Sequence, residues 1–208
     1  MSREELREQN KRLVVEKALE LFLRKGIKRT SIKDIARASG LTDRSVYRYF
    51  ENKTEIVLAT MFLFWEHISA QAENLVSGQS YQGMTGIEQV STIIRFYASM
   101  YLEHPEHVRY ILQAEAELYS AGITADIKAR PPGRFDDGNT PMLRAILAGQ
   151  KDGSISSEVN AKKIYYNSYD ALLGTMQRQV LGSTDCDLDK AERMDHLCDL
   201  FVKAYQGK

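Results

Sequence analysis

Residues 31–50 read SIKDIARASGLTDRSVYRYF, a stretch that holds two short helical patterns around a tight turn. The first pattern predicts a helix over residues 32–39, which Gly40 ends. Thr42 is a good capping residue for a second helix, predicted over residues 43–49. Because two short helices joined by so brief a turn are typical of a helix-turn-helix, we predict that motif here.

The polar and apolar residues of this stretch support the same motif. Thr30 or Ser31 can cap the first helix, and Asp34 would complete a capping-box-like pair with Ser31. Leu41 supplies an apolar side chain that can plug the core between the two helices. The second helix then turns a polar face outward, which consists of Asp43, Arg44, Ser45, Tyr47 and Arg48.

Apolar residues recur at helical spacing along the rest of the chain, and no stretch alternates for long enough to require a strand. We therefore predict an all-α protein of about nine helices, with an N-terminal three-helix domain that carries the helix-turn-helix and a C-terminal helical domain. Residues 77–86 contain three glycines and are predicted to form a loop. The predicted helices span residues 4–25, 32–39, 43–49, 52–75, 87–103, 105–120, 142–151, 158–181 and 188–205.

Charge is divided unevenly along the chain. The 208 residues include 28 lysines and arginines and 28 aspartates and glutamates. Residues 1–54 hold 14 of the basic residues against 8 acidic ones, whereas residues 55–208 hold 14 against 20. Such a division suggests that one end faces a polyanion while the other does different work. We predict domains over residues 1–54 and 55–208.

The composition is that of a globular protein, with 43% hydrophobic and 27% charged residues. These values exclude a disordered or collagen-like chain, and two cysteines, Cys186 and Cys198, favour a reducing compartment. Residues 1–12 lack the apolar core of a signal peptide. Residues 57–65 form the longest apolar stretch and are too few to span a bilayer. We therefore expect a cytoplasmic protein with no membrane partner.

The region around the helix-turn-helix resembles the TetR (tetracycline repressor) family of bacterial transcription regulators over about residues 13–60. The matching residues are Gly26, Thr30-Ser31, Ile35-Ala36, Ala38-Ser39-Gly40-Leu41-Thr42, Val46-Tyr47-Arg48-Tyr49-Phe50 and Lys53 with Glu55-Ile56. The resemblance implies a ligand-responsive regulator that binds specific double-stranded DNA. Repression is the usual output of the family, and activation stays open.

The resemblance also implies roles for individual residues on DNA. Arg44 and Ser45 would approach base edges, where an arginine can bond guanine bidentately. Asp43 departs from the small or basic residues common there, and would either accept from a cytosine amino group or reinforce the helix cap. The residues implied to contact the DNA backbone are Ser31, Lys33, Thr42, Tyr47, Arg48, Tyr49 and Lys53.

One such unit reads only a few base pairs, so specific binding calls for a dimer on two half-sites. In the family the last two long helices pair with their symmetry mates, which implies a homodimer here. Part of the same apolar faces would also serve the core of each protomer. The candidate interface residues are Tyr165, Tyr169, Leu172, Leu173, Met176, Val180, Met194, Leu197, Phe201 and Tyr205.

The resemblance further implies an effector pocket in the C-terminal domain. Apolar walls with a few phenolic hydroxyls suit a small hydrophobic or aromatic effector, although aromatic stripes also serve as core. Binding of that effector is expected to weaken binding to a palindromic operator. The candidate pocket residues are Phe62, Trp65, Phe96, Tyr97, Met100, Tyr101, Tyr110, Tyr119 and Tyr169.

No metal, cofactor or catalytic residue is predicted. His104 and His107 lack a third ligand at a familiar spacing. The chain has no phosphate-binding loop, dinucleotide fingerprint or nucleophile elbow, so we predict that it is not an enzyme. The alternative is an all-helical small-molecule-binding protein or enzyme whose helix-turn-helix is incidental. Salt-dependent binding to random duplex DNA would distinguish the two.

Overall fold

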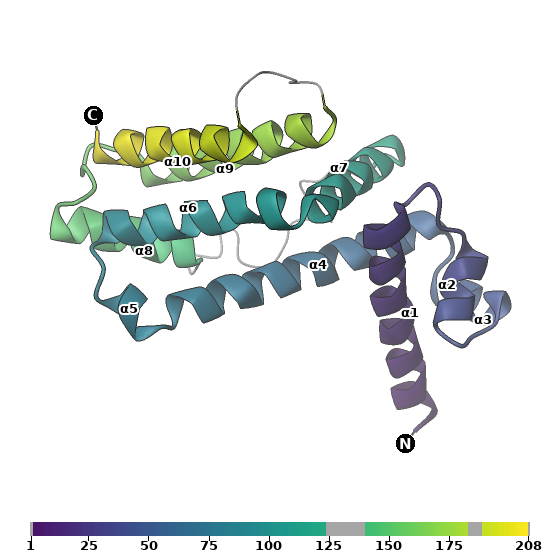
Figure 1. The fold of residues 1–208 in the computed structure, drawn as a ribbon. Coiled ribbons are helices and arrows are strands. Elements are labelled where there is room, and N and C mark those ends of the chain that lie inside the picture. The colour runs from purple at the N-terminus through teal and green to yellow at the C-terminus, as the bar shows by residue number, and fades with distance from the viewer. Residues whose placement is uncertain (1, 124–139, 183–188, 208) are drawn as a thin grey trace. The chain divides into compact units, whose positions relative to one another are not determined.

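The computed structural model describes residues 2–123, 140–182 and 189–207 of the chain. Helices dominate these residues, and no strand occurs among them, which confirms the prediction of an all-α protein. The helices are α1 Arg3–Lys25, α2 Ile32–Ala38, α3 Asp43–Tyr49, α4 Lys53–Val76, α5 Gln79–Gln82, α6 Gly86–Glu103, α7 Pro105–Ser120, α8 Pro141–Asp152, α9 Ala161–Val180 and α10 Lys190–Gln206 (Figure 1).

Contacts group the residues into two compact units. Unit 1 comprises Met1–His67 and Arg109–Pro132, and unit 2 comprises Ile68–Val108 and Gly133–Lys208. Helices α4 and α7 therefore each contribute residues to both units. The sequence predicted a domain boundary after residue 54 from the charge distribution and the helix-turn-helix, and that boundary stays a prediction. Packing instead extends unit 1 to His67 and adds most of α7 to it.

The core of unit 1 is built where α1 contacts α2 and α3. Val14, Ala18 and Phe22 lie on the buried face of α1, and Ile35 of α2 and Val46 of α3 are fully buried with them. Burial of each such side chain is worth about 1.5–3 kcal/mol. Helices as short as α2 and α3 are unstable alone, so this shared core is what holds them in place.

A left-handed glycine shapes the turn between α2 and α3. Gly40 has a φ of 67°, where a residue with a Cβ is strained. The N–H of Leu41 then donates to the carbonyl of Ala36 at 2.9 Å and closes the end of α2. The hydroxyl of Thr42 accepts the N–H of Ser45 at 3.2 Å and begins α3. The predicted glycine stop and threonine cap are therefore confirmed.

Unit 2 packs α6 against α8, α9 and α10. The tightest approach is at the start of α6, where a Cβ on Gly86 would lie 2.0 Å from the backbone nitrogen of Gly149 in α8. The N–H of Gly86 donates to Asp152 Oδ2 at 2.7 Å. On α10, Asp195 and Asp199 both pair with Arg95 of α6. Backbone contact and charge thus fix α6 between its neighbours.

One short helix occupies a stretch that the sequence predicted to be a loop. Helix α5 forms a single turn within residues 77–86, and its Tyr81 is buried. The burial of that ring explains how a turn flanked by glycines stays helical. With α5 included, the described residues form ten helices where about nine were predicted.

The start of α9 also differs from the prediction, which placed it at residue 158. The helix begins at Ala161 because the side chain of Asn160 accepts the N–H of Lys163 at 2.9 Å and caps it.

Cys186 lies outside the described residues. Within the described ranges, no helix combines the length and the apolar character needed to cross a membrane.

Candidate nucleic-acid interface and effector cavity

Side-chain caps set where α2 begins. Ser31 accepts the N–H of Asp34 at 3.2 Å, and Asp34 Oδ2 accepts both the N–H and the hydroxyl of Ser31 at 2.9 Å. These bonds from Ser31, followed by the charge of Lys25, hold the pKa of Asp34 below its ordinary value. The predicted capping box is therefore confirmed, and a phosphate contact from Ser31 would share its hydroxyl with this cap.

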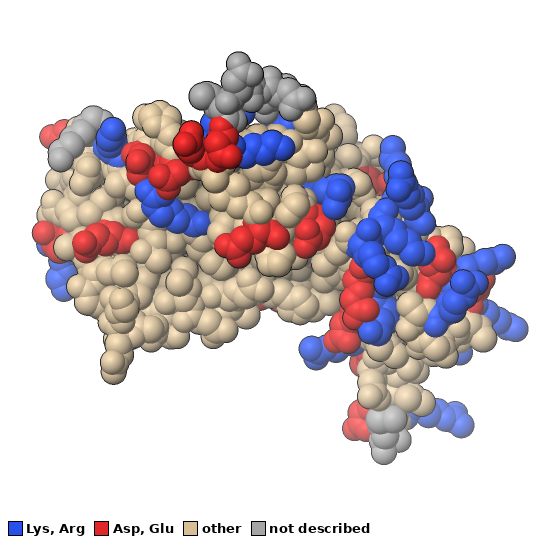
Figure 2. All heavy atoms as spheres, viewed as in Figure 1, with Lys and Arg blue, Asp and Glu red and all other residues tan. Residues whose placement is uncertain are grey.

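Helix α3 buries one residue and exposes the charged face that the sequence predicted. Val46 is 0% exposed, whereas Arg44 and Arg48 are exposed and Tyr47 is 55% exposed. Figure 2 shows Lys and Arg side chains gathered over α1, α2 and α3. An exposed helix of this kind fits the major groove of DNA, and its cationic surroundings suit phosphates.

Other predicted contact residues take more constrained positions. Arg48 Nη2 donates to the hydroxyl of Tyr49 at 3.0 Å, and this bond is the main cause of a lowered pKa for Tyr49. Asp43 is half-buried in the first turn of α3, where its charge complements the helix dipole. The hydroxyls of Thr42 and Ser45 lie 3.0 Å apart. These contacts orient the face of α3 before any ligand is present.

Lys53, the first residue of α4, is anchored within unit 1. Its Nζ donates a hydrogen bond to the backbone carbonyl of Ile27, in the loop that follows α1. Burial lowers the pKa of Lys53, against the opposing attraction of Glu117. Lys53 therefore joins the start of α4 to the loop before α2, and a phosphate would have to share its ammonium group with that carbonyl.

Two hydrogen bonds tie α7 to the rest of unit 1, and the sequence analysis did not find them. Gln113 Oε1 accepts the N–H of Ile27 at 2.8 Å, across 86 residues. Thr54 Oγ1 donates to Glu117 Oε1 at 3.2 Å, across 63 residues. No local pattern signals such pairs, because the partners are far apart in the sequence and Gln113, Thr54 and Glu117 look like ordinary polar surface residues.

Unit 2 contains a small cavity bounded by α6, α8 and α9. Its volume of ≈ 20 Å³ holds about one water molecule. The rings of Tyr97 and Tyr169 meet edge-on there, with centroids 6.3 Å apart. Burial raises the pKa of Tyr97, so its hydroxyl stays protonated. The lining residues are Ile94, Tyr97, Met142, Tyr165, Ser168, Tyr169 and Leu172.

The predicted effector residues are distributed over both units. Tyr97 and Tyr169 line the cavity of unit 2. Three more belong to unit 2 outside the cavity lining: Met100 and Tyr101 are buried, and Phe96 is partly exposed. The remaining four belong to unit 1: Phe62, Trp65, Tyr110 and Tyr119.

Two of the predicted pocket residues lie at opposite extremes of exposure. Tyr119 is 82% exposed at the end of α7, so it does not line an enclosed pocket. Tyr110 is 1% exposed and donates its hydroxyl to Thr60 Oγ1 at 2.8 Å, so it belongs to the core of unit 1. Periodicity placed both on helices correctly, but the neighbours of each ring depend on packing.

The helix-turn-helix is also recognised by comparison with known families. Residues 14–60 match the family model described as bacterial regulatory proteins, tetR family. That range runs from within α1 to within α4 and contains the whole helix-turn-helix. Over these residues the chain is similar to TetR-family regulatory proteins.

Solved structures of TetR-family proteins share the fold over almost the whole chain. A regulator from Marinobacter aquaeolei VT8 has 24% identity and a TM-score of 0.60, over 96% of this chain and 97% of that one. One from Mesorhizobium loti MAFF303099 has 18% identity and a TM-score of 0.62, over 100% and 98%. RolR, solved with its ligand resorcinol, has 15% identity and a TM-score of 0.66, over 98% and 90%.

The match to the TetR-family model favours the first of the two functions that the sequence left open. The model describes bacterial regulatory proteins, which supports a DNA-binding regulator over an enzyme. The exposed face of α3 is consistent with that assignment, since Arg44 and Tyr47 are available to a ligand as large as DNA.

Half of the predicted dimer residues are buried inside the protomer. Leu172, Leu173, Met176, Met194 and Tyr205 are at most 9% exposed, and the hydroxyl of Tyr205 lies 3.1 Å from that of Ser168. These side chains form the core of unit 2, which is the second use that the sequence analysis allowed for the same apolar faces. Partly exposed are Tyr165, Tyr169, Val180, Leu197 and Phe201.

Proposed function

We propose that this protein is a repressor that binds a palindromic operator as a homodimer and is released by a small hydrophobic or aromatic effector. The observation that carries the proposal is the exposed face of α3. Arg44 and Tyr47 are exposed on it, while Val46 on the opposite side is fully buried and anchors the helix. Side chains held in this way can contact DNA without any rearrangement of unit 1.

The proposed base contacts come from α3, and the proposed backbone contacts come from α2, α3 and the start of α4. Arg44 and Ser45 lie in the first turn of α3, the part of a recognition helix that reaches base edges. Tyr47 and Lys33 are exposed and would contact phosphates. The remaining proposed contacts are Asp43, in the first turn of α3, and five residues that keep their structural bonds in the complex: Ser31, Thr42, Arg48, Tyr49 and Lys53.

The operator contacts are tested by selection of bound sequences from a random duplex pool, followed by titration at several salt concentrations. We expect a palindrome and a steep loss of affinity with salt. Lys33→Ala should reduce the slope of log K against log salt by about 0.9, the value of one phosphate contact. Lys163→Ala, which removes an exposed cation on α9, is the matched control. Salt-independent binding, or no binding to any duplex, would refute the proposal.

The proposed dimer surface is the groove between α9 and α10. Its lining combines apolar and charged groups, namely Thr175, Glu192, Arg193, His196, Leu197 and Leu200. Leu200 is 47% exposed and lies in the groove beside Leu197, so a partner seated there would cover both apolar side chains. A second copy of the chain is the proposed occupant, since two recognition helices are needed for a palindrome.

Sedimentation analysis tests this surface. Leu200→Glu should convert the dimer to a monomer, because a carboxylate would be buried without a partner. Leu147→Glu on α8 is the control, since Leu147 is similarly exposed at 52% and lies outside the groove. A monomeric wild-type protein at micromolar concentration, or equal effects of the two variants, would contradict the dimer surface.

The proposed effector site is the cavity at Tyr97 and Tyr169. A drug-sized ligand needs about 300–1,000 Å³, so the effector would stabilise a conformer in which this cavity is open. Helices α4 and α7 run from one unit into the other and would carry the change. An effector that prefers the DNA-incompetent conformer would weaken operator binding by its differential affinity, commonly about 1–3 kcal/mol.

A screen of small phenols and apolar acids against the operator complex tests this site. Resorcinol, the ligand in the RolR structure, is a suitable first compound. Tyr97→Phe should change the concentration of an active compound needed for release, whereas Tyr119→Phe, on a ring that is 82% exposed, should not. Equal responses of the two variants would place the effector elsewhere, and a broad screen without any releasing compound would refute induction.

A further inference from the structure

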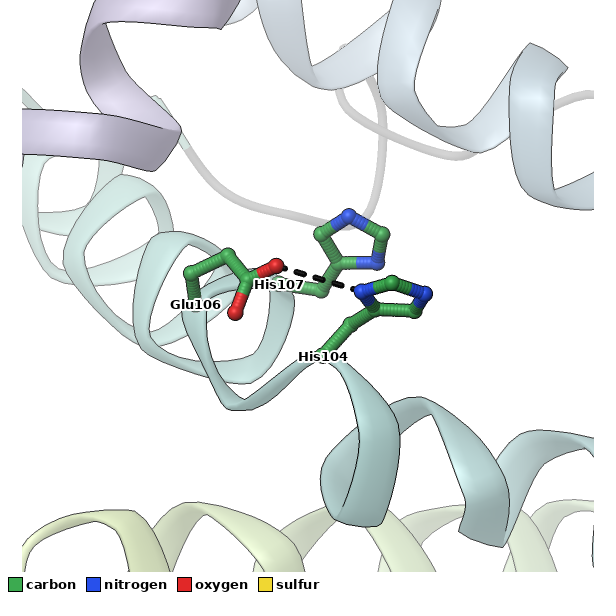
Figure 3. Close-up of side chains that lie close together, drawn as sticks. All are labelled: His104, Glu106 and His107. Atoms are coloured by element: carbon green, nitrogen blue, oxygen red, sulfur yellow. Dashed lines mark hydrogen bonds and ion pairs between the residues drawn. The ribbon is translucent and has the colours of Figure 1, made fainter.

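Two histidines and a glutamate lie together where α6 ends and α7 begins. His104 Nδ1 lies 3.2 Å from Glu106 Oε1, and the rings of His104 and His107 stack with centroids 4.8 Å apart. One ligand atom from each of the three residues lies within 4.8 Å of the other two. Figure 3 shows the carboxylate and both imidazole rings converging beside the turn.

The backbone explains why these side chains converge. His104 is the C-cap of α6, and Pro105 is the first residue of α7. The N–H of His107 donates to the carbonyl of His104 at 2.9 Å, which makes the segment a closed turn. This closed turn holds the backbone of the three residues together, so rotation about side-chain bonds is all that is needed to bring their ligand atoms to one point.

The distances are close to those of a coordination site. Metal bonds of about 2.1 Å in a tetrahedron place neighbouring donor atoms about 3.4 Å apart. The pair formed by His104 and Glu106, at 3.2 Å, already meets this spacing. The other separations, which are at most 4.8 Å, would close by rotation about side-chain bonds. The side chain of His104 is 55% exposed, so an ion can enter from solvent.

The donor set indicates the class of metal. Two imidazoles and one carboxylate suit zinc, nickel and copper, whereas magnesium and calcium prefer oxygen donors alone. Local charge also favours a cation, since Glu106 carries a carboxylate and the carbonyl end of α6 is the negative end of its dipole. No other group of three such side chains meets the same distance limit among the residues that the structure describes.

We propose that His104, Glu106 and His107 bind one divalent transition-metal ion, Zn²⁺, Ni²⁺ or Cu²⁺, with water completing its coordination. The sequence predicted no metal here because the two histidines lacked a third ligand at a familiar spacing, and the turn supplies Glu106 as that ligand. The bound ion would link the end of α6 to the first turn of α7.

Equilibrium dialysis of the full chain against Zn²⁺ tests the proposal, with metal content measured by mass spectrometry. We expect one Zn²⁺ per chain at micromolar free metal. His104→Ala and Glu106→Gln should each weaken binding at least about tenfold, as the loss of a direct ligand requires. His67→Ala and His196→Ala are matched controls, because these exposed histidines lie outside the cluster and should leave binding unchanged.

Two further measurements make the test independent of folding defects. His104 is exposed, so circular dichroism of His104→Ala should match the wild type without metal. The Co²⁺ form should show visible bands without the charge-transfer band of a thiolate, which excludes cysteine as the ligand. Failure to take up stoichiometric Zn²⁺, uptake unchanged in His104→Ala and Glu106→Gln, or a thiolate band would each overturn the proposal.

Discussion

Gln113 Oε1 accepts the backbone N–H of Ile27 at 2.8 Å and thereby joins α7 to the loop that precedes the helix-turn-helix. The loop is shaped around this amide: a Cβ on Gly26 would lie 3.0 Å from the same oxygen, and Gly26 has a φ of 88°. Lys53 donates to the carbonyl of Ile27. The backbone N–H and the backbone carbonyl of Ile27 are therefore both held by side chains. A helix distant in sequence is thus part of unit 1, which carries the helix-turn-helix.

Gln113→Ala is expected to destabilise unit 1 by about 1–3 kcal/mol, because the N–H of Ile27 would lose its partner in a partly buried position. Urea unfolding followed by circular dichroism measures the change. Gln71→Ala is the matched control, since Gln71 is exposed on α4 and its loss should cost no more than about 0.5 kcal/mol. Equal costs for the two variants would show that the bond to Ile27 is not stabilising.

Arg44→Ala is expected to weaken binding to the selected operator by about 1–3 kcal/mol and to relax the preference at one base pair of each half-site. The reason is that an arginine on the first turn of α3 can read a base edge. Affinities for the operator and for single-base variants of it measure the effect. Lys33→Ala provides the contrast, with a uniform loss on all sequences. A uniform loss for Arg44→Ala as well would make Arg44 a phosphate contact.

Gly86→Ala is expected to destabilise unit 2 by about 1–3 kcal/mol or more, because the added Cβ would meet the backbone of Gly149 at 2.0 Å and α8 would have to move. Gly78→Ala is the control, since its nearest neighbour would be an ordinary contact at 3.7 Å. Thermal unfolding of both variants measures the difference. Similar melting temperatures would mean that α6 and α8 can separate at little cost.

Acid is expected to weaken the connection between α8 and α6 at Asp152. Hydrogen bonds from Ser154 and from the N–H of Gly86 hold the pKa of Asp152 below its ordinary value of 3.8. Because the folded carboxyl has the lower pKa, its contribution to stability is complete above pH 3.8 and is lost as the pH falls through the folded pKa. Urea midpoints of wild type and Asp152→Asn should therefore differ at about pH 6 and converge towards about pH 2. A difference that stays constant with pH would exclude this role for the charge.

Prediction from the sequence succeeded where the determining contacts are local. The capping pairs Ser31 with Asp34 and Thr42 with Ser45 are each three residues apart, and both are present as predicted. Prediction was incomplete where a contact spans the chain. The stripe on α10 was correctly identified as apolar, but Tyr205 faces the core of its own unit, since periodicity shows that a face is covered and not what covers it.

The amino-acid order alone determined an all-helical chain with a basic helix-turn-helix at its front, because capping, glycine stops and helical periodicity act between residues at most four positions apart. Packing alone decided that α7 supports unit 1 through Gln113, that Tyr97 and Tyr169 share a cavity, and that Glu106 joins two histidines. These features depend on which surfaces meet after the chain has folded, and the free energy of that choice is spread over many side chains far apart in the sequence.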